Sequence, residues 1–506
     1  MATAADRLAA VRHGYRHRKD ARRIADLGFA SYAVGIIVLV VGIPLIRAII
    51  ILLTEPPVLS LLQSPASSSA VSVVVGLILA GFASLGQLRG PVSLSPFFVT
   101  LLASTDLARS RTLLRPFTIS TSIVVTVFMA FGVLVSCVLV SAGAASPLDA
   151  VGFVIGCASV AFIACAVWLA GQRTSRRPWI LPSSIIGATL LTVVIEPLRV
   201  ILPWGWDGIL WPGTSASGTW AALLLVLAAA ASLFWVPRLL NLLDSSALLE
   251  QATRWRSAGI SAMSGDFAAA LGGFRARPAL GRSWTAVTGS NVLTRFLLRD
   301  LIGTLRTPGR FVIGTLVLIV ACSVCHLGSA VAGIPSWLLA GIGSAAGYLA
   351  LGVFSDGFRH AAEATGKPAL YGYGTSLLYS LHAVLPATFA LVAVIAGAAA
   401  LFLLNVPPGH PSAVLAVAVV LVILRAYDSA KGPLPPILMT PIPSSAGDLS
   451  GLVILAWQTD ALLSATIAGA AIVSLTTSGN LFSAFATAMG VVAGLLFLLR
   501  RRLRRL

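Results

Sequence analysis

Residues 29–53 read FASYAVGIIVLVVGIPLIRAIIILL, an apolar stretch in which Arg47 is the single charged residue. A helix needs about 20 predominantly apolar residues to cross the hydrocarbon core of a bilayer, so this stretch is long enough to span a membrane. It also exceeds the apolar region of a cleavable signal peptide, which has roughly 7–15 residues. We therefore expect it to remain in the membrane as a signal anchor.

The whole chain resembles this stretch in composition. Of its 506 residues, 57% are hydrophobic and 10% are charged, and the mean hydropathy is +0.94. Soluble domains carry about 25% charged residues, so this chain has too few polar side chains to cover a soluble globule. The net charge is +18, but its placement along the chain points to membrane lipid and not to nucleic acid as the partner.

Other apolar stretches of similar length predict an all-α, polytopic bundle of about 12 transmembrane spans. The predicted spans lie near 29–53, 70–88, 117–142, 150–171, 180–202, 218–238, 311–331, 335–354, 374–404, 412–426, 449–474 and 481–499.

Basic residues mark alternate loops of this twelve-span arrangement. The segment before the first span is rich in arginine, the loop that holds Glu55 has no Lys or Arg, and this alternation continues to the Arg-rich tail after residue 499. All but two basic residues fall on one side, which is the positive-inside pattern. We therefore expect a multi-pass plasma-membrane protein with both termini in the cytoplasm.

A long basic connection divides the predicted spans into six and six. The expected parts are 1–238, 239–310 and 311–506, namely a six-span half with a basic N-terminal helix, a cytoplasmic or interfacial connector, and a second six-span half. Within the connector, leucines and arginines of 293–305 fall on different faces of a helix. This pattern predicts an amphipathic helix in the membrane interface, and the basic stretch 16–27 stands in the same relation to the first span.

Two loop segments suggest that the halves arose by duplication. Residues 90–107 read GPVSLSPFFVTLLASTDL, and residues 432–449 read GPLPPILMTPIPSSAGDL. Both begin with Gly-Pro, continue through an apolar patch that contains Thr, and end in Asp-Leu. Because both precede a span on the predicted cytoplasmic side, each half would present a related hairpin there.

Three charged residues fall inside predicted spans, where a charge costs at least about 2.5–3.5 kcal/mol. Asp460 is expected close to the middle of span eleven, Arg47 in the outer half of span one, and Glu196 in the outer half of span five, with Arg199 one turn further on. These groups could line a substrate path or lock helices together. The alternative for Arg47 and Glu196 is simple pairing between neighbouring helices, and for Asp460 it is hydrogen bonding to nearby Trp and Gln.

The sequence predicts no cofactor, no metal site and no enzymatic activity. It has no P-loop, since Gly366-Lys367 is followed by Pro368 and lacks a Gly-rich loop. Cys322-Ser-Val-Cys325-His326 has the C-x-x-C-H form of c-type haem attachment. It lies within a continuous apolar run, however, which favours ordinary packing in a helix.

Three segments carry a resemblance to a known family. They are KGPLPPILMTPIPSSAGDLSGLVILAWQTDALL (431–463), TRFLLRDLIGTLRTPGRF (294–311) and GPVSLSPFFVTLLASTDLARSRTLLRP (90–116). The chain resembles an actinobacterial family of polytopic membrane proteins related to the permeases of type-2 ABC exporters. The resemblance implies that 294–311 is an elbow helix and that the loops 90–116 and 432–448 dock a separate ATPase subunit.

On this resemblance, we expect the chain to be the permease subunit of an ABC-type exporter. Asp106, Arg109, Arg111 and Asp448 are the predicted polar docking contacts, unless they are ordinary solvated loop charges. Type-2 permeases often have six spans and dimerise, so this chain could supply both halves or pair with a second permease subunit. The alternatives are a proton-coupled secondary transporter of six-plus-six architecture and a membrane scaffold that does not transport.

Overall fold

The structure, a computed structural model, describes most of the chain. The described residues are 28, 31–32, 34–36, 38–103, 107–174, 179–212, 218–263, 270, 272–274, 278, 280–281, 283–287, 291–365, 372–432, 434–444 and 447–504. The predicted basic helix at 16–27 and the predicted docking residue Asp106 lie outside these residues.

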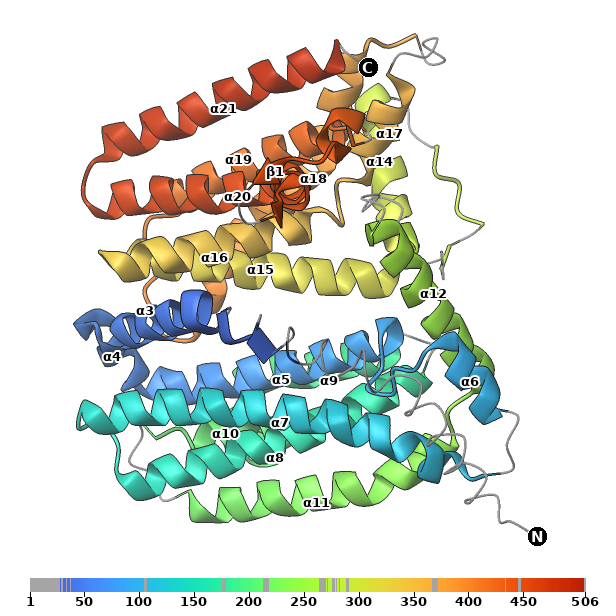
Figure 1. The fold of residues 1–506 in the computed structure, drawn as a ribbon. Coiled ribbons are helices and arrows are strands. Elements are labelled where there is room, and N and C mark those ends of the chain that lie inside the picture. The colour runs from blue at the N-terminus through green and yellow to red at the C-terminus, as the bar shows by residue number, and fades with distance from the viewer. Residues whose placement is uncertain are drawn as a thin grey trace. The chain divides into compact units, whose positions relative to one another are not determined.

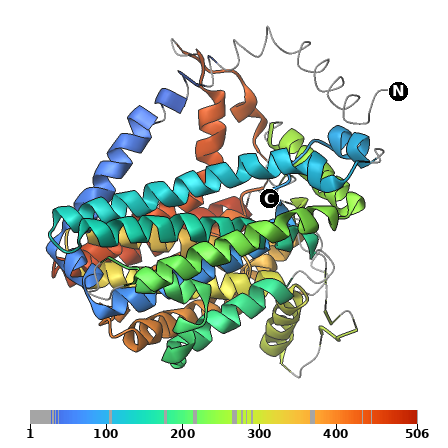
Figure 2. The same cartoon turned by 90° about the horizontal axis from the view of Figure 1, so that it is seen from below.

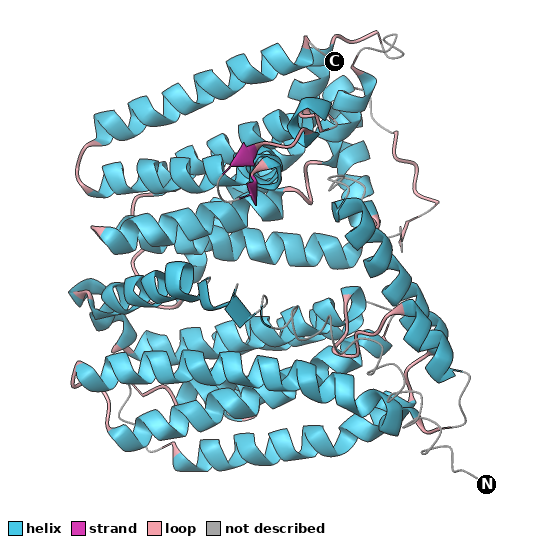
Figure 3. Ribbon diagram, in the orientation of Figure 1, coloured by secondary structure: helices cyan, strands magenta, loops and turns pink. Residues whose placement is uncertain are grey.

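The chain forms two compact units, residues 1–256 (unit 1) and 257–506 (unit 2). Their boundary falls inside helix α12 (Ser245–Met263), and therefore within the segment that we expected to connect the two halves. Figures 1 and 3 show that the described part is built from helices, with a single pair of very short strands.

Unit 1 is a helical bundle. Its elements before α12 are η1 (Val38–Gly42), α3 (Ile43–Thr54), α4 (Pro56–Leu62), α5 (Pro65–Leu88), α6 (Pro96–Ala103), α7 (Arg109–Ser141), α8 (Pro147–Arg173), α9 (Ile180–Val194), η2 (Glu196–Val200), α10 (Pro203–Ile209) and α11 (Thr219–Asn241).

Helix α8 is the centre of unit 1, because α5, α7 and α11 all pack against it. Its buried face is rich in small residues, and Gly171 lies so close to α5 that a Cβ there would collide with the backbone of Ala83. Close approach of this kind is how helices pack within a bilayer, where lipid supplies no hydrophobic drive between them. In contrast, α3 has no buried residue; it contacts α4 and α7 and projects at an angle to α7 in Figure 2.

The fifth predicted span is interrupted. We expected a helix over 180–202, but α9 ends at Val194 and is followed by the short helices η2 and α10. Pro197 and Pro203 each occupy a first helical turn, where the missing N–H is harmless, whereas inside a helix either would remove a hydrogen bond. Glu196 therefore lies on η2, and not on a membrane helix as predicted.

Unit 2 contains the remaining elements. They are α14 (Val292–Leu305), α15 (Pro308–Ala330), α16 (Ile334–Leu351), α17 (Asp356–Ala364), α18 (Thr375–Leu403), α19 (Pro411–Ser429), η3 (Pro436–Met439), β1 (Pro443–Ser444), β2 (Gly447–Asp448), α20 (Ser450–Thr477) and α21 (Leu481–Leu503). The strands β1 and β2 pair antiparallel.

Helix α16 holds unit 2 together, because it packs closely on both α15 and α20. Gly343 and Gly469 explain the close fit: a Cβ at Gly343 would collide with Cys325 of α15, and one at Gly469 of α20 would collide with Ser344 of α16. Helices α18, α19 and α21 complete the bundle, and their buried residues join those of α15, α16 and α20 in one core.

The amphipathic helix expected at 293–305 is present as α14. Its N-terminus is capped by Asn291, and it ends just before Pro308, which begins α15. Phe296 is buried, and Leu297 and Leu301 pack against the core of unit 2. Leu297 and Leu301 therefore meet protein while Leu293 is 42% exposed, whereas the apolar face of a helix lying in the membrane interface would meet acyl chains.

Eleven described helices have the length and apolar composition of membrane spans, and α9 is a shorter apolar helix near the fifth expected position. The prediction of an all-α polytopic bundle is thus confirmed.

Candidate functional site

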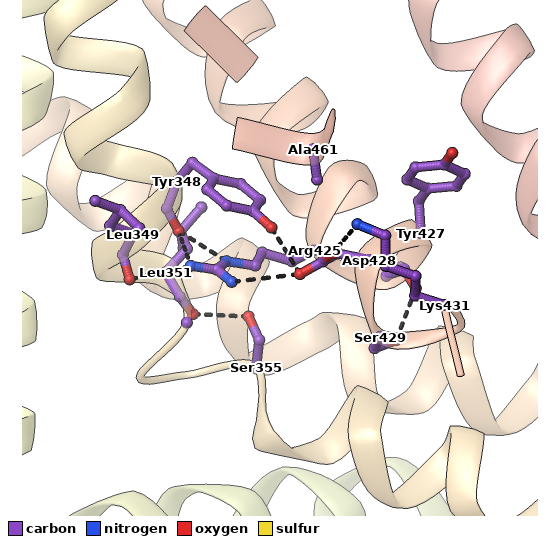
Figure 4. Close-up of polar contacts among 12 residues, drawn as sticks. Tyr348, Leu349, Leu351, Ser355, Arg425, Tyr427, Asp428, Ser429, Lys431 and Ala461 are labelled. Carbon is purple, nitrogen blue, oxygen red and sulfur yellow. Dashed lines mark hydrogen bonds and ion pairs between the residues drawn. The ribbon is translucent and has the colours of Figure 1, made fainter. Parts of the chain in front are cut away.

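A network of charged and aromatic side chains joins the helices of unit 2 at one end of the bundle. We call it the ion network, and its members are Tyr348, Arg425, Tyr427, Asp428, Lys431, Asp460 and Arg502. These residues come from α16, α19, α20, α21 and the residues just after α19. Figure 4 shows the part of the network around Tyr348, Arg425, Asp428 and Lys431. The network lies where α16, α19 and α21 end, so the alternating helix directions bring these residues together.

Arg425 connects α19 to the C-terminal end of α16. Its guanidinium donates to the carbonyl oxygens of Tyr348 and Leu349 and lies over the Tyr348 ring at 3.8 Å. Carbonyl groups in the last turn of a helix lack partners within the helix and carry its negative dipole end, so a cation is favoured there. Asp428 accepts a 2.8 Å hydrogen bond from the Tyr348 hydroxyl and closes this contact.

Lys431 lies between two carboxylates. Its ammonium group pairs with Asp460 and lies 3.5 Å from Asp428, and it stands over the Trp457 ring at 4.7 Å. The side chain is only 8% exposed, and a cation this buried requires such partners. Lys431 therefore ties the end of α19 to α20.

Arg502 attaches α21 to the same carboxylate. Its guanidinium lies 3.4 Å from Asp460, donates a 2.6 Å hydrogen bond to the Tyr427 hydroxyl and covers the Tyr427 ring at 3.6 Å. Asp460 is thus shared by two cations from two other parts of unit 2.

The expected depth of Asp460 near the middle of the membrane stays a prediction, and what the structure gives is its place within unit 2. The buried residues of α20 begin at Ala461, and Arg502 lies in the last turn of α21. Asp460 consequently lies where α20 enters the bundle, level with the ends of its neighbours. Its contacts are those of a helix lock, one of the two roles considered for it.

A second polar contact, between a carboxylate and a histidine, ties α14 to the bundle. His382 of α18 and Asp300 of α14 lie 2.5 Å apart, with side chains 2% and 7% exposed. The Phe296 ring stands edge-on to the imidazole, and a Cβ on Gly357 of α17 would collide with both polar groups. This tightly enclosed pair fixes the amphipathic helix on α18.

Arg47 and Glu196 do not take part in comparable contacts. Both are exposed, and neither forms an ion pair within the described part of the chain. Pairing between neighbouring helices, which we considered for both, is therefore not observed. Arg199 instead donates to the hydroxyls of Ser68 and Ser69 on α5.

The predicted docking residues have different surroundings. Arg109 and Arg111 lie in the first turn of α7, half-buried and exposed respectively. Asp448 organises its own loop, because it accepts hydrogen bonds from the Ile442 and Ser450 backbone N–H groups at 2.8 and 2.9 Å and from the Ser450 hydroxyl at 2.7 Å. These bonds to Ser450 and Ile442 lower the pKa of Asp448 below its ordinary value.

The two related loop segments differ in burial. Gly90, Pro91 and Val92 are buried, and Gln172 and Gln251 hold this loop with hydrogen bonds to its backbone. In the second segment, the side chains of Ile437, Met439 and Ile442 are exposed by 74%, 50% and 38%. Only the helix α6 of the first segment carries similarly exposed apolar groups, such as Phe97 at 52%.

The Cys-x-x-Cys-His segment lies inside α15. Cys322, Cys325 and His326 are all buried, and His326 Nε2 lies 3.1 Å from the carbonyl oxygen of Val394 on α18. Within the described residues no cluster of three or more His, Cys, Asp or Glu could hold a metal ion. Cys322 and Cys325 belong to the core of unit 2.

Sequence reasoning missed most of the ion network. Arg425, Asp428, Lys431 and His382 were not singled out from the sequence. One feature of the sequence could have pointed to the network. An aromatic residue stands within three positions of several of its charged residues, as in Tyr427-Asp428 and Trp457-Gln-Thr-Asp460.

The fold and the ion network define a multi-pass helical membrane protein whose span ends are tied together by charge. Comparison with protein families, with curated proteins and with solved structures finds no match.

Proposed function

We propose that this chain is the permease subunit of an ABC-type exporter, driven by a separate ATPase subunit that docks on the loop 432–449. The observation that carries the proposal is the row of exposed apolar side chains on this loop, Ile437, Met439 and Ile442. The paired strands β1 and β2 and the hydrogen bonds of Asp448 give the loop a defined shape. Apolar groups on a fixed support are typical of a protein docking surface.

The same loop is joined to the ion network. Asp448 accepts from the backbone N–H of Ser450, the first residue of α20. Ten residues further along α20, Asp460 meets Lys431 and Arg502. Because a helix is stiff along its axis, pressure on the loop would reach the ends of α19 and α21 through α20. This route would couple an ATPase cycle to the spans.

The positive-inside pattern gives the loop its expected side. Arg310, Arg425, Lys431 and Arg502 gather at one end of unit 2, and this end would face the cytoplasm, where an ATPase has access to ATP. Helix α3 has no buried residue, which leaves room for lipid or a second permease subunit at its surface.

Purification from native membrane tests the proposal. We expect the full chain, solubilised in mild detergent, to co-purify with a P-loop ATPase, and the double variant Ile437→Ser, Met439→Ser to lose about tenfold or more of it. The matched control is Ile201→Ser, which alters an isoleucine 66% exposed in unit 1 and should leave the yield of ATPase unchanged.

Two results would reject the proposal. One is transport by proteoliposomes of the chain alone, driven by a proton gradient without ATPase. The other is equal loss of the ATPase in the double variant and in the Ile201 control, which would indicate a general effect of removing exposed apolar side chains.

A further inference from the structure

Asp207 of α10 is a carboxyl group buried in unit 1 without a counter-ion. The residue is 2% exposed, and α10 packs against η2, α5, α8 and α11. Its Oδ1 atom has no hydrogen-bond partner among the described protein atoms. A buried carboxylate normally has a cation or several hydrogen-bond donors close by, and Asp207 departs from this rule.

No charged side chain on the surrounding elements compensates Asp207. Helix α5 has no charged residue, and Arg199 of η2 directs its guanidinium at Ser68 and Ser69. On α8, Cys157 is a buried neutral thiol, Asp149 lies in the first turn and Arg173 is the last residue. Glu196 of η2 is exposed, and Arg238 lies in the last turn of α11.

The surroundings of Asp207 leave no room for a larger ligand. A Cβ added to Gly156 of α8 would lie 2.7 Å from Oδ1 and 2.9 Å from the Leu210 side chain. On the neighbouring face of α10, a Cβ on Gly208 would collide with Ser72 and with the backbone of Ser68. The one ligand that fits a carboxyl group packed in this way is a proton.

The neutral form of Asp207 suits this position and the charged form does not. Burial disfavours the carboxylate and raises the pKa of Asp207 from 3.8 to about 7. In an opened arrangement with α10 in water, the carboxyl would return to its ordinary pKa. The closed arrangement therefore holds the proton more tightly, and its stability falls as the pH rises from about 4 to about 7.

We propose that Asp207 is a proton-binding site that keeps α10 seated between α5 and α8 while it is protonated and lets α10 leave when it ionises. The site is independent of the proposed ATPase contact, because α10 belongs to unit 1 and the loop 432–449 belongs to unit 2.

Hydrogen exchange across residues 203–211 of the purified full chain tests this site. Exchange rates of the wild type are divided by those of Asp207→Asn at the same pH, which removes the intrinsic pH dependence of amide exchange. We expect this ratio to rise about tenfold per pH unit between about pH 5 and pH 7 and then to level off. Glu196→Gln, a change in an exposed acid on η2, should keep the wild-type profile.

A second variant covers the case in which Asp207→Asn does not fold. Gly156→Ala places a methyl group against Oδ1, so residues 203–211 should exchange quickly even in acid, while the rest of unit 1 keeps its protection. A ratio that stays flat with pH, or a Gly156→Ala protein that exchanges like the wild type at every pH, would overturn the proposal.

Discussion

The two units treat their acidic side chains in opposite ways. In unit 2, Asp300, Asp428 and Asp460 each lie beside a basic side chain. In unit 1, Asp207 is buried deeper than any of them and has no basic neighbour in hydrogen-bonding contact. Polar pairing in unit 2 therefore ties helices together, whereas in unit 1 the same type of side chain holds its helix only while it is neutral.

This difference can be tested because neutralising an acid should have opposite effects in the two units. Removing one partner of a buried pair leaves the other charge uncompensated, which is costly. Removing the charge of an unpaired buried acid eliminates the free-energy cost of keeping that charge away from water. Four predictions follow in order of expected size.

The largest effect is expected at the pair of Asp300 and His382. Asp300→Ala should lower the free energy of unfolding by about 3 kcal/mol, because both side chains are almost fully buried. Denaturant unfolding in detergent measures the loss, and hydrogen exchange should show α14 released from α18. The matched control is Glu363→Ala, which removes an exposed pair with Arg359 and should cost under about 1 kcal/mol. If Asp300→Ala and Glu363→Ala lowered the free energy of unfolding equally, burial would not explain the strength of the Asp300–His382 contact.

Lys431 should show the next largest effect. Lys431→Met leaves Asp428 and Asp460 facing one another without their shared cation, and we expect a loss of about 2 kcal/mol. The figure is smaller than for Asp300 because both carboxylates are 30% exposed. Lys431→Arg should recover most of the stability, and Lys431→Met combined with Asp460→Asn should be less damaging than the sum of the single changes.

Asp207 should behave in the opposite way. At pH 8, Asp207→Asn should be more stable than the wild type by at least about 2 kcal/mol, since the asparagine carries no charge to bury and each tenfold change per pH unit corresponds to about 1.4 kcal/mol. At pH 5 the advantage should vanish, because the wild-type carboxyl is protonated there. Denaturant unfolding at the two pH values measures both numbers, and a destabilised variant at pH 8 would remove the contrast between the units.

The smallest effect is expected at Asp448. Asp448→Ala removes three hydrogen bonds from an exposed loop, so residues 441–450 should exchange faster while the global unfolding midpoint stays unchanged. The wild-type loop should lose the same protection as the pH falls below about 4, because the lowered pKa of Asp448 makes its charged form the one that stabilises the loop. The control is Asp149→Ala, which removes another exposed acid at the start of α8. This variant should leave the exchange of residues 441–450 unchanged.

Hydropathy predicted most spans but failed at the fifth. The run 180–202 is apolar throughout most of its length, yet it contains Pro197 and Pro203, and the structure turns at both. Those prolines were visible in the sequence and would have justified a shorter helix. The same turn places α10 against α5 and α8, so the missed break also concealed the burial of Asp207.

Charge partners were harder to predict than spans. Asp460 was recognised as a candidate, but the cations that meet it were not. Its partners Lys431 and Arg502 are 29 and 42 residues away along the chain. Nothing local to Asp460 identifies them.

By itself, the sequence determined that this chain is a polytopic helical membrane protein, because twenty apolar residues in a row are sufficient to decide insertion of a helix. It also determined which loops are basic. Only the tertiary structure decided that Asp460 meets two cations, that Asp300 meets His382 and that Asp207 meets none. Hydropathy is a property of one segment, whereas the electrostatic environment of a buried acid depends on which other helices pack around it.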